Sequence, residues 1–109
     1  MGYNEELEIR LVQLIKERRD IHRRRMFGGL GFLLRGNMCF GIWKDHLILR
    51  IGESKAESAL RKTNVVPFDI TGRPMKGWVM VLPQALRSKA SLNRWIKQAI
   101  DFVEQLPKK

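Results

Sequence analysis

Apolar residues recur with a helical period at the two ends of the chain. In residues 4–20, NEELEIRLVQLIKERRD, they fall at positions i, i+4, i+7 and i+8, which is one stripe of an amphipathic helix. This stripe consists of Leu7, Leu11, Leu14 and Ile15. Asn4 is the expected N-cap of this helix. Residues 88–106 predict a second helix, whose apolar stripe is Leu92, Trp95, Ile96, Ala99, Ile100, Val103 and Leu106.

Between these helices the apolar period shortens to that of strands. Short apolar runs at residues 30–34 and 38–43 flank Gly36-Asn37, and a glycine in first place suits a two-residue hairpin turn of type II′. Lys44-Asp45 offers a second tight turn before a third strand, HLILRI, at residues 46–51. Alternation puts Leu47, Leu49 and Ile51 on one face of that strand, and His46, Ile48 and Arg50 on the other.

The second half of the chain adds a short helix and a further strand. Ser54 and Glu57 have the spacing of a capping box, and Asn64 is the expected terminator of the helix that they open. Residues 65–77, VVPFDITGRPMKG, contain two prolines and two glycines, which predicts a loop or an irregular edge with an extra short strand near 65–70. GWVMVL at residues 77–82 then predicts another strand.

The predicted order is therefore α-β-β-β-α-β-α. It indicates an α+β protein with a mainly antiparallel sheet and flanking helices. The length of 109 residues predicts a single domain, residues 1–109. No apolar run approaches the roughly 20 residues that span a bilayer, and the N-terminus lacks the pattern of a signal peptide. We therefore expect a cytoplasmic protein that has no contact with a membrane.

Charge gives the first functional hypothesis. The formal net charge is +10, and residues 16–25, KERRDIHRRR, carry six basic residues against two acidic ones. A nucleic-acid-binding protein would use this cluster to grip phosphates. The candidate residues are Arg18, Arg19, Arg23, Arg24 and Arg25. This hypothesis predicts that they converge on one exposed face; the alternative is the solvated, charged end of the first helix.

The glycines that follow the arginines do not form a phosphate-binding loop. GGLGFLLRG lacks the Lys-Ser or Lys-Thr of a P-loop, and Leu34 holds the third glycine position of a dinucleotide fingerprint. The order is also inverted, because a helix precedes the glycines and a strand follows them. We interpret Gly28, Gly29 and Gly31 as positions of positive φ, a bulge or close backbone packing where the chain leaves the first helix.

Catalytic chemistry has little support in the sequence. One cysteine and two distant histidines predict neither a metal cluster nor a Cys-His pair, and we expect no cofactor. Cys39 lies within an apolar strand and is interpreted as a buried structural thiol, with a reactive thiol as the alternative. An enzyme would need an apolar pocket near Cys39, His46 and residues 67–77.

Two separated motifs resemble one known family. RRRMFGGLGFLLRGNMCFGIWKDHLILRIG, residues 23–52, is similar to the N-terminal domain of the TfoX/Sxy family of bacterial competence regulators. Its most distinctive piece follows the arginines and consists of Met26, Phe27, Gly28 and Gly29. The later motif consists of Pro67, Phe68, Pro74, Met75, Lys76, Gly77 and Trp78. The resemblance covers roughly residues 10–104.

This resemblance implies a secretion-chaperone-like TfoX-N fold that dimerises. It also implies a non-enzymatic regulatory role that is exerted through a protein partner, with a transcription factor as the candidate. Full-length members carry a second, helical domain, for which this sequence has no counterpart. The competence role beside a cyclic-AMP receptor-type factor is therefore not carried over. We expect MFGG to mark the start of the strands, and the arginines before it to form an exposed basic shoulder.

Overall fold

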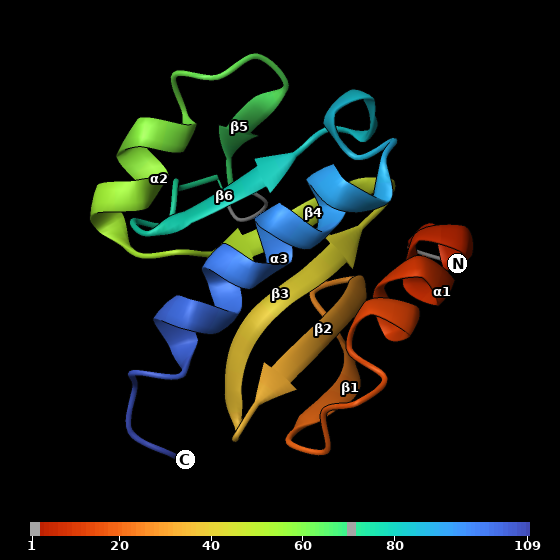
Figure 1. The fold of residues 1–109 in the computed structure, drawn as a ribbon. Helices are drawn as coiled ribbons and strands as arrows, with labels where there is room; N and C mark the ends of the chain where they lie inside the picture. Colours follow the sequence, from red (N-terminus) through yellow and green to blue (C-terminus); the bar gives the residue numbers. More distant parts are fainter. Residues whose placement is uncertain (1–2, 70–71) are drawn as a thin grey trace.

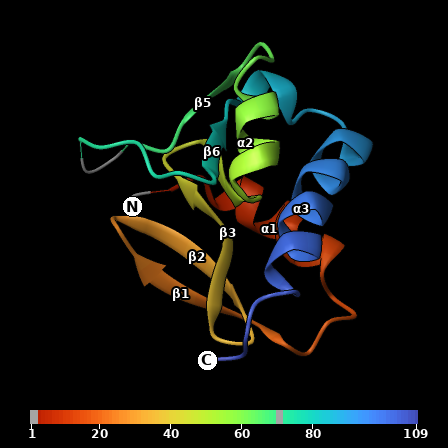
Figure 2. The same cartoon turned by 90° about the vertical axis from the view of Figure 1, so that its left-hand side faces the viewer.

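The computed structural model describes residues 3–69 and 72–109. In this part of the chain one six-stranded sheet is covered on one face by three helices (Figures 1 and 2). The elements in chain order are α1 (Glu5–Leu14), β1 (Ile21–Met26), β2 (Gly29–Leu34), β3 (Asn37–Trp43), β4 (His46–Arg50), α2 (Glu53–Ala59), β5 (Val65–Pro67), β6 (Trp78–Val81), the 3₁₀ turn η1 (Pro83–Ala85) and α3 (Lys89–Val103).

The strands follow the spatial order β1-β2-β3-β4-β6-β5, and every neighbouring pair is antiparallel. This confirms the predicted α+β class with a mainly antiparallel sheet. The short strand expected near residues 65–70 is β5, which ends at Pro67; Ile70 lies outside the described residues. Within the described part of the chain, each helix is too short or too polar to traverse a bilayer.

The first helix is shorter than predicted, and a strand follows it. Asn4 is its N-cap, as expected, and accepts a hydrogen bond from the Leu7 backbone N–H. The helix ends at Leu14, because residues 16–20 contain no apolar side chain that a further turn would bury. The arginines of residues 23–25 belong instead to β1, which pairs with β2 over its full length. The interpretation of these arginines as a helix end was therefore wrong.

Two hairpin turns explain the glycines of this region. Phe27-Gly28 joins β1 to β2, and Arg35-Gly36 joins β2 to β3. All four residues have positive φ, as a type I′ turn requires. The predicted Gly36-Asn37 turn was thus one residue too late: Asn37 is buried, pairs with Leu34 and donates a hydrogen bond to the Pro107 carbonyl oxygen. The Lys44-Asp45 turn is confirmed by the pairing of the residues on either side of it.

The capping box predicted for α2 is absent. Gly52 occupies the N-cap position with φ +89°, and no side chain caps this helix. Ser54 lies inside α2, and Asn64 lies beyond its end at a positive φ that leads into β5. By contrast, α3 begins as predicted, because the Ser88 side chain accepts a hydrogen bond from the Ser91 backbone N–H.

The main core lies between the sheet and the three helices. At its centre the rings of Phe32 and Phe40 are stacked at 4.6 Å between centroids. The register of β2 against β3 shifts at Phe32/Leu33, and both Cys39 and Phe40 are buried in this core. A second, smaller cluster lies on the opposite face and is centred on Ile48 and Met80. The alternation predicted for residues 46–51 is therefore confirmed.

Candidate protein-interaction surface

Within the described part of the chain the helices lie on one face of the sheet (Figure 2), and the opposite face carries a second cluster of apolar side chains. We call it the open face and define it by Phe27, Trp43, Ile48, Val66, Phe68, Trp78 and Met80. Ile48, Phe68 and Met80 are buried, whereas the other four are half-buried. Phe68 contacts both Phe27, edge to face at 6.1 Å, and Trp78, at 5.5 Å between centroids. An apolar, aromatic surface of this kind is typical of a protein contact.

Glycines on β2 and β3 let bulky side chains lie flat on this face. A Cβ at Gly31 would collide with the Met26 sulfur, and a Cβ at Gly41 would lie 2.9 Å from the Met38 methyl carbon. A Cβ at Gly29 would lie 2.9 Å from the Phe27 ring. The MFGG segment thus combines a hairpin turn with space for Phe27 against the sheet. The expectation that these glycines serve positive φ or close packing is confirmed, but they lie in the β1–β2 turn and in β2, not where the chain leaves the first helix.

Two cations lie over the half-buried tryptophan rings of the open face. The Lys44 ammonium lies 4.7 Å from the centroid of the Trp43 ring, and the Arg50 guanidinium lies 5.4 Å from the centroid of the Trp78 ring. Such cation–π pairs keep a charged, hydrated group beside an apolar ring. They explain how a half-buried aromatic surface is tolerated on the free molecule.

The structure does not bring the five candidate arginines together. Arg23 and Arg25 lie on the helix side of β1, where Arg23 forms a 2.6 Å ion pair with Glu8 and Arg25 lies 5.7 Å from the Tyr3 ring centroid. Arg24 points to the opposite face, because neighbouring strand residues alternate. Arg18 bridges Asp20 and Glu104, and Arg19 is exposed in the loop before β1. Convergence on one exposed face is therefore not observed.

Arg18 instead ties the loop before β1 to the end of α3. Its guanidinium donates two hydrogen bonds to the Asp20 carboxylate, at 3.1 Å each, and one to Glu104 at 2.8 Å. These bonds raise the pKa of Arg18, and the hydrogen bond from Arg18 holds the pKa of Asp20 below its ordinary value. A carboxylate whose pKa is lower in the folded than in the unfolded state adds to the free energy of unfolding. This contribution is complete above the pKa of the unfolded state and is lost as the pH falls through the pKa of the folded state.

Arg18→Ala is therefore expected to lower the free energy of unfolding by about 1 kcal/mol at neutral pH. The difference from wild type should shrink at acidic pH, where Asp20 of the unfolded chain takes up its proton before the carboxylate paired with Arg18 does. Urea denaturation at pH 7 and pH 3 measures both effects. Lys97→Ala is the control, because Lys97 pairs with Asp101 at an exposed position and should change little. A larger loss for Arg18→Ala at pH 3 than at pH 7 would contradict this account.

The residues considered for an enzyme are separated. Cys39 is fully buried in the main core, whereas His46 lies on the other face of the sheet. Burial raises the pKa of the Cys39 thiol to about 12. Among the described residues, no three His, Cys, Asp or Glu side chains are grouped as metal ligands would be. The structure thus supports the interpretation of Cys39 as a structural thiol.

Cys39 of the folded protein is expected to react with a thiol reagent on the order of a thousandfold more slowly than the same cysteine in urea. Both its burial and its raised pKa remove the thiolate that reacts. Release of thionitrobenzoate from Ellman's reagent, followed with and without urea, measures the ratio. Comparable rates in the two conditions would show that Cys39 is accessible and reactive.

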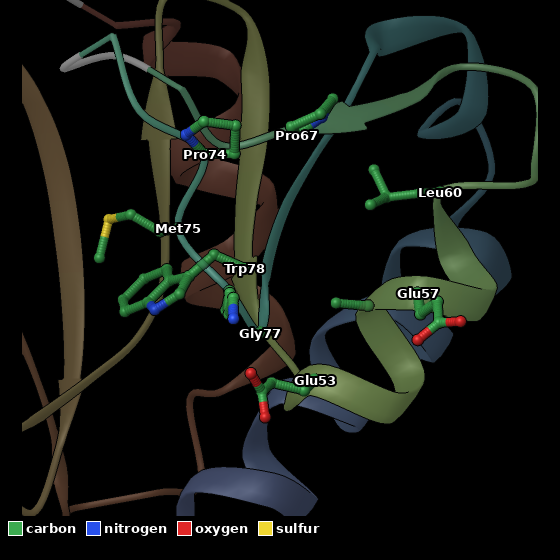
Figure 3. Close-up of a pocket in the computed structure, with 10 residues that line it drawn as sticks. Glu53, Glu57, Leu60, Pro67, Pro74, Met75, Gly77 and Trp78 are labelled. Carbon is green, nitrogen blue, oxygen red and sulfur yellow. The ribbon is translucent and has the colours of Figure 1, made fainter.

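A groove lies beside the open face, between α2 and the segment that leads into β6 (Figure 3). We call it the α2 groove; its volume is about 460 Å³. Its apolar lining consists of Ala56, Leu60, Pro67, Pro74, Met75 and Trp78. Glu53 and Glu57 stand on the α2 side, and Lys76 and Gly77 on the other. The second family motif, from Pro74 to Gly77, therefore forms one wall of a groove.

Sequence analysis missed this surface. Phe27, Trp43 and Trp78 lie half-buried on the open face, whereas Phe32, Phe40 and Trp95 belong to the main core. One feature of the sequence could have indicated the open face: the four consecutive apolar residues of β6 place apolar side chains on both faces of the sheet. The roles of Glu53, Glu57 and Leu60 had no signal in the sequence pattern.

Comparison with protein-family models gives one match. The model of the TfoX N-terminal domain matches residues 13–103. No curated protein and no solved structure matches the chain significantly. The match spans most of the chain and includes both motifs on which the resemblance rested. The chain therefore belongs to the TfoX N-terminal domain family.

Proposed function

We propose that the chain is a cytoplasmic, non-enzymatic regulatory module that forms a single domain over residues 1–109 and acts by binding proteins. It pairs with a second copy of itself and acts on a protein partner in transcriptional regulation, with a transcription factor as the candidate. The open face carries this proposal. Its aromatic side chains form one cluster in which Phe27, Trp43 and Trp78 are half-buried around the buried Phe68, and aromatic clusters of this kind are typical of the centre of protein interfaces.

The pairing is tested by sedimentation velocity over a range of protein concentrations. Wild type is expected to shift from monomer to dimer as the concentration rises. Trp43→Glu should stay monomeric, because it places an unpaired charge in the open face. Arg94→Glu, at an exposed position of α3, is the control and should dimerise like wild type. A wild-type chain that stays monomeric at every protein concentration would contradict the proposed dimer.

The alternative function is that of a basic nucleic-acid-binding protein that uses the cluster from Arg18 to Arg25. The net charge of +10 favours it, but the ion pairs of Arg18 and Arg23 and the opposite orientation of Arg24 weaken it. Fluorescence anisotropy with labelled duplex and single-stranded DNA at about 50 and 200 mM salt distinguishes nucleic-acid binding from the proposed protein binding. Tight binding that falls steeply with salt and is lost in Arg19→Ala/Arg24→Ala would favour the alternative.

A further inference from the structure

The α2 groove combines features that together describe its occupant. We propose that it binds a short extended segment of a partner protein in which a lysine or arginine lies next to an apolar side chain. This inference rests on the proposed function and deepens it, because it assigns a second contact and states its chemistry. Three properties of the groove support it: its exposed apolar side chains, its fixed wall and its local charge.

The apolar part of the groove is unusually exposed for this protein. Leu60 is 39% exposed and Met75 is 42% exposed, and both line the groove. Among the large apolar side chains of the described residues, Ile9 alone also has such an exposure. Leu60 lies on the α2 side and Met75 on the opposite side, where its side chain points away from Leu60, and Pro67 and Pro74 lie at one end of the groove (Figure 3). An apolar side chain inserted here would be removed from water against Leu60, Pro67 and Pro74.

The wall opposite α2 is held in place by backbone hydrogen bonds. The Met75 N–H donates to the Phe68 carbonyl oxygen at 3.1 Å. The Gly77 carbonyl oxygen accepts from the backbone N–H groups of Ile51 and Gly52, at 2.9 and 3.1 Å. Gly77 has φ +86°, and a Cβ there would be in ordinary van der Waals contact, at 3.4 Å, with the backbone of Gly52 and Glu53. The wall is therefore fixed before a ligand arrives, which lowers the entropy cost of binding.

The charge of the groove is opposite to that of the whole protein. Glu53 and Glu57 lie one helical turn apart on α2, and both line the groove. Among the described residues, neither carboxylate has a cation within ion-pair distance. Lys76 is the one basic residue of the lining, so the groove has a net charge of −1 (two acidic residues against one basic) in a chain of +10. Charge complementarity therefore favours a basic group beside the inserted apolar side chain.

Two matched peptides test this inference on the full-length chain. The probes are acetyl-Leu-Lys-Leu-amide and acetyl-Leu-Glu-Leu-amide, titrated to millimolar concentration into ¹⁵N-labelled protein and followed by amide chemical shifts. The net charge of +10 alone would attract the acidic peptide. We expect the opposite order: the lysine peptide binds roughly threefold to tenfold more tightly, and its shifts lie at residues 53–60 and 74–78.

Two double variants complete the test. Glu53→Gln/Glu57→Gln should abolish the preference for the lysine peptide and leave the fold intact, because both side chains are exposed. Glu5→Gln/Glu6→Gln changes the net charge equally on α1, away from the groove, and should keep the preference. Equal or tighter binding of the acidic peptide, shifts outside the groove, or no shifts at all would overturn the inference. The proposed function would survive each of these results, because it depends on contacts of the open face.

Discussion

Phe40→Ala is expected to lower the free energy of unfolding by about 3–5 kcal/mol. Phe40 is fully buried in β3, stacks on Phe32 and pairs across the sheet with both β2 and β4. Its removal leaves a cavity at the centre of the main core, where strands on both sides prevent collapse. A domain of this size is typically stable by about 5–15 kcal/mol, so the loss is a large fraction of the total.

Urea denaturation of the variant and of wild type measures this effect. Ile9→Ala is the control, since Ile9 is 63% exposed on α1 and its truncation should change stability by no more than about 0.5 kcal/mol. Similar losses for Phe40→Ala and Ile9→Ala would mean that the core is not packed as described.

Gly29→Ala is expected to destabilise by about 3 kcal/mol, at the upper end of the range for overpacked sites. The added Cβ would collide with the Ile42 carbonyl oxygen and lie 2.9 Å from the Phe27 ring. The first of these atoms belongs to the backbone of β3, so β2 and β3 would have to separate. Gly29 has an ordinary φ, and the effect is therefore purely steric.

Two neighbouring glycines provide a graded comparison for Gly29. Gly28 has φ +76° but open space around it, so Gly28→Ala should cost about 1 kcal/mol for the left-handed conformation. At Gly31 the main obstacles are the flexible side chains of Met26 and Met38, which predicts an intermediate loss for Gly31→Ala. Urea denaturation of the three variants gives their order. A Gly28→Ala variant less stable than Gly29→Ala would contradict the described packing of β2 on β3.

The sequence predicted the fold class because its helices and central strands have clear periods. The apolar stripe from Leu92 to Val103 predicts α3, and the alternation around Leu47 and Leu49 predicts both faces of β4. Each of these elements buries one side against a neighbouring layer of the structure. The spacing of its apolar residues along the chain therefore shows which side is buried.

The strand β1 could not be predicted from its own residues. Residues 22–25 are all basic, so no alternation of apolar and polar residues indicates a strand there. The charged residues 16–20 also read as a continuation of the helix α1. The strand forms because β2, fully buried, offers an edge with which six residues pair. Charged side chains on such an edge strand also discourage pairing with other chains.

The dispersal of the five candidate arginines could not be predicted for a related reason. Five arginines within eight residues form a surface patch only if their side chains point to the same side of the molecule. In a strand, successive side chains point to opposite faces of the sheet. The open face and the α2 groove arise where β4, β6 and the segment before β6 meet, so their members are up to about 50 residues apart in sequence. Trp43 and Trp78 are half-buried because the helices cover the other face of the sheet. The amino-acid composition does not show which face of a sheet the helices will cover.

The most direct measurement of the central claim is photo-crosslinking in cells that naturally express the chain. A benzophenone amino acid replaces Trp43 on the open face, or Arg94 on the exposed side of α3 as a control. We predict a discrete cross-link to a second copy or to one regulatory protein from position 43, and none from position 94. The cross-link should disappear when Trp78→Glu is added. Absence of a cross-link from position 43, or equal products from both positions, would contradict the assignment of the open face as a protein-binding surface.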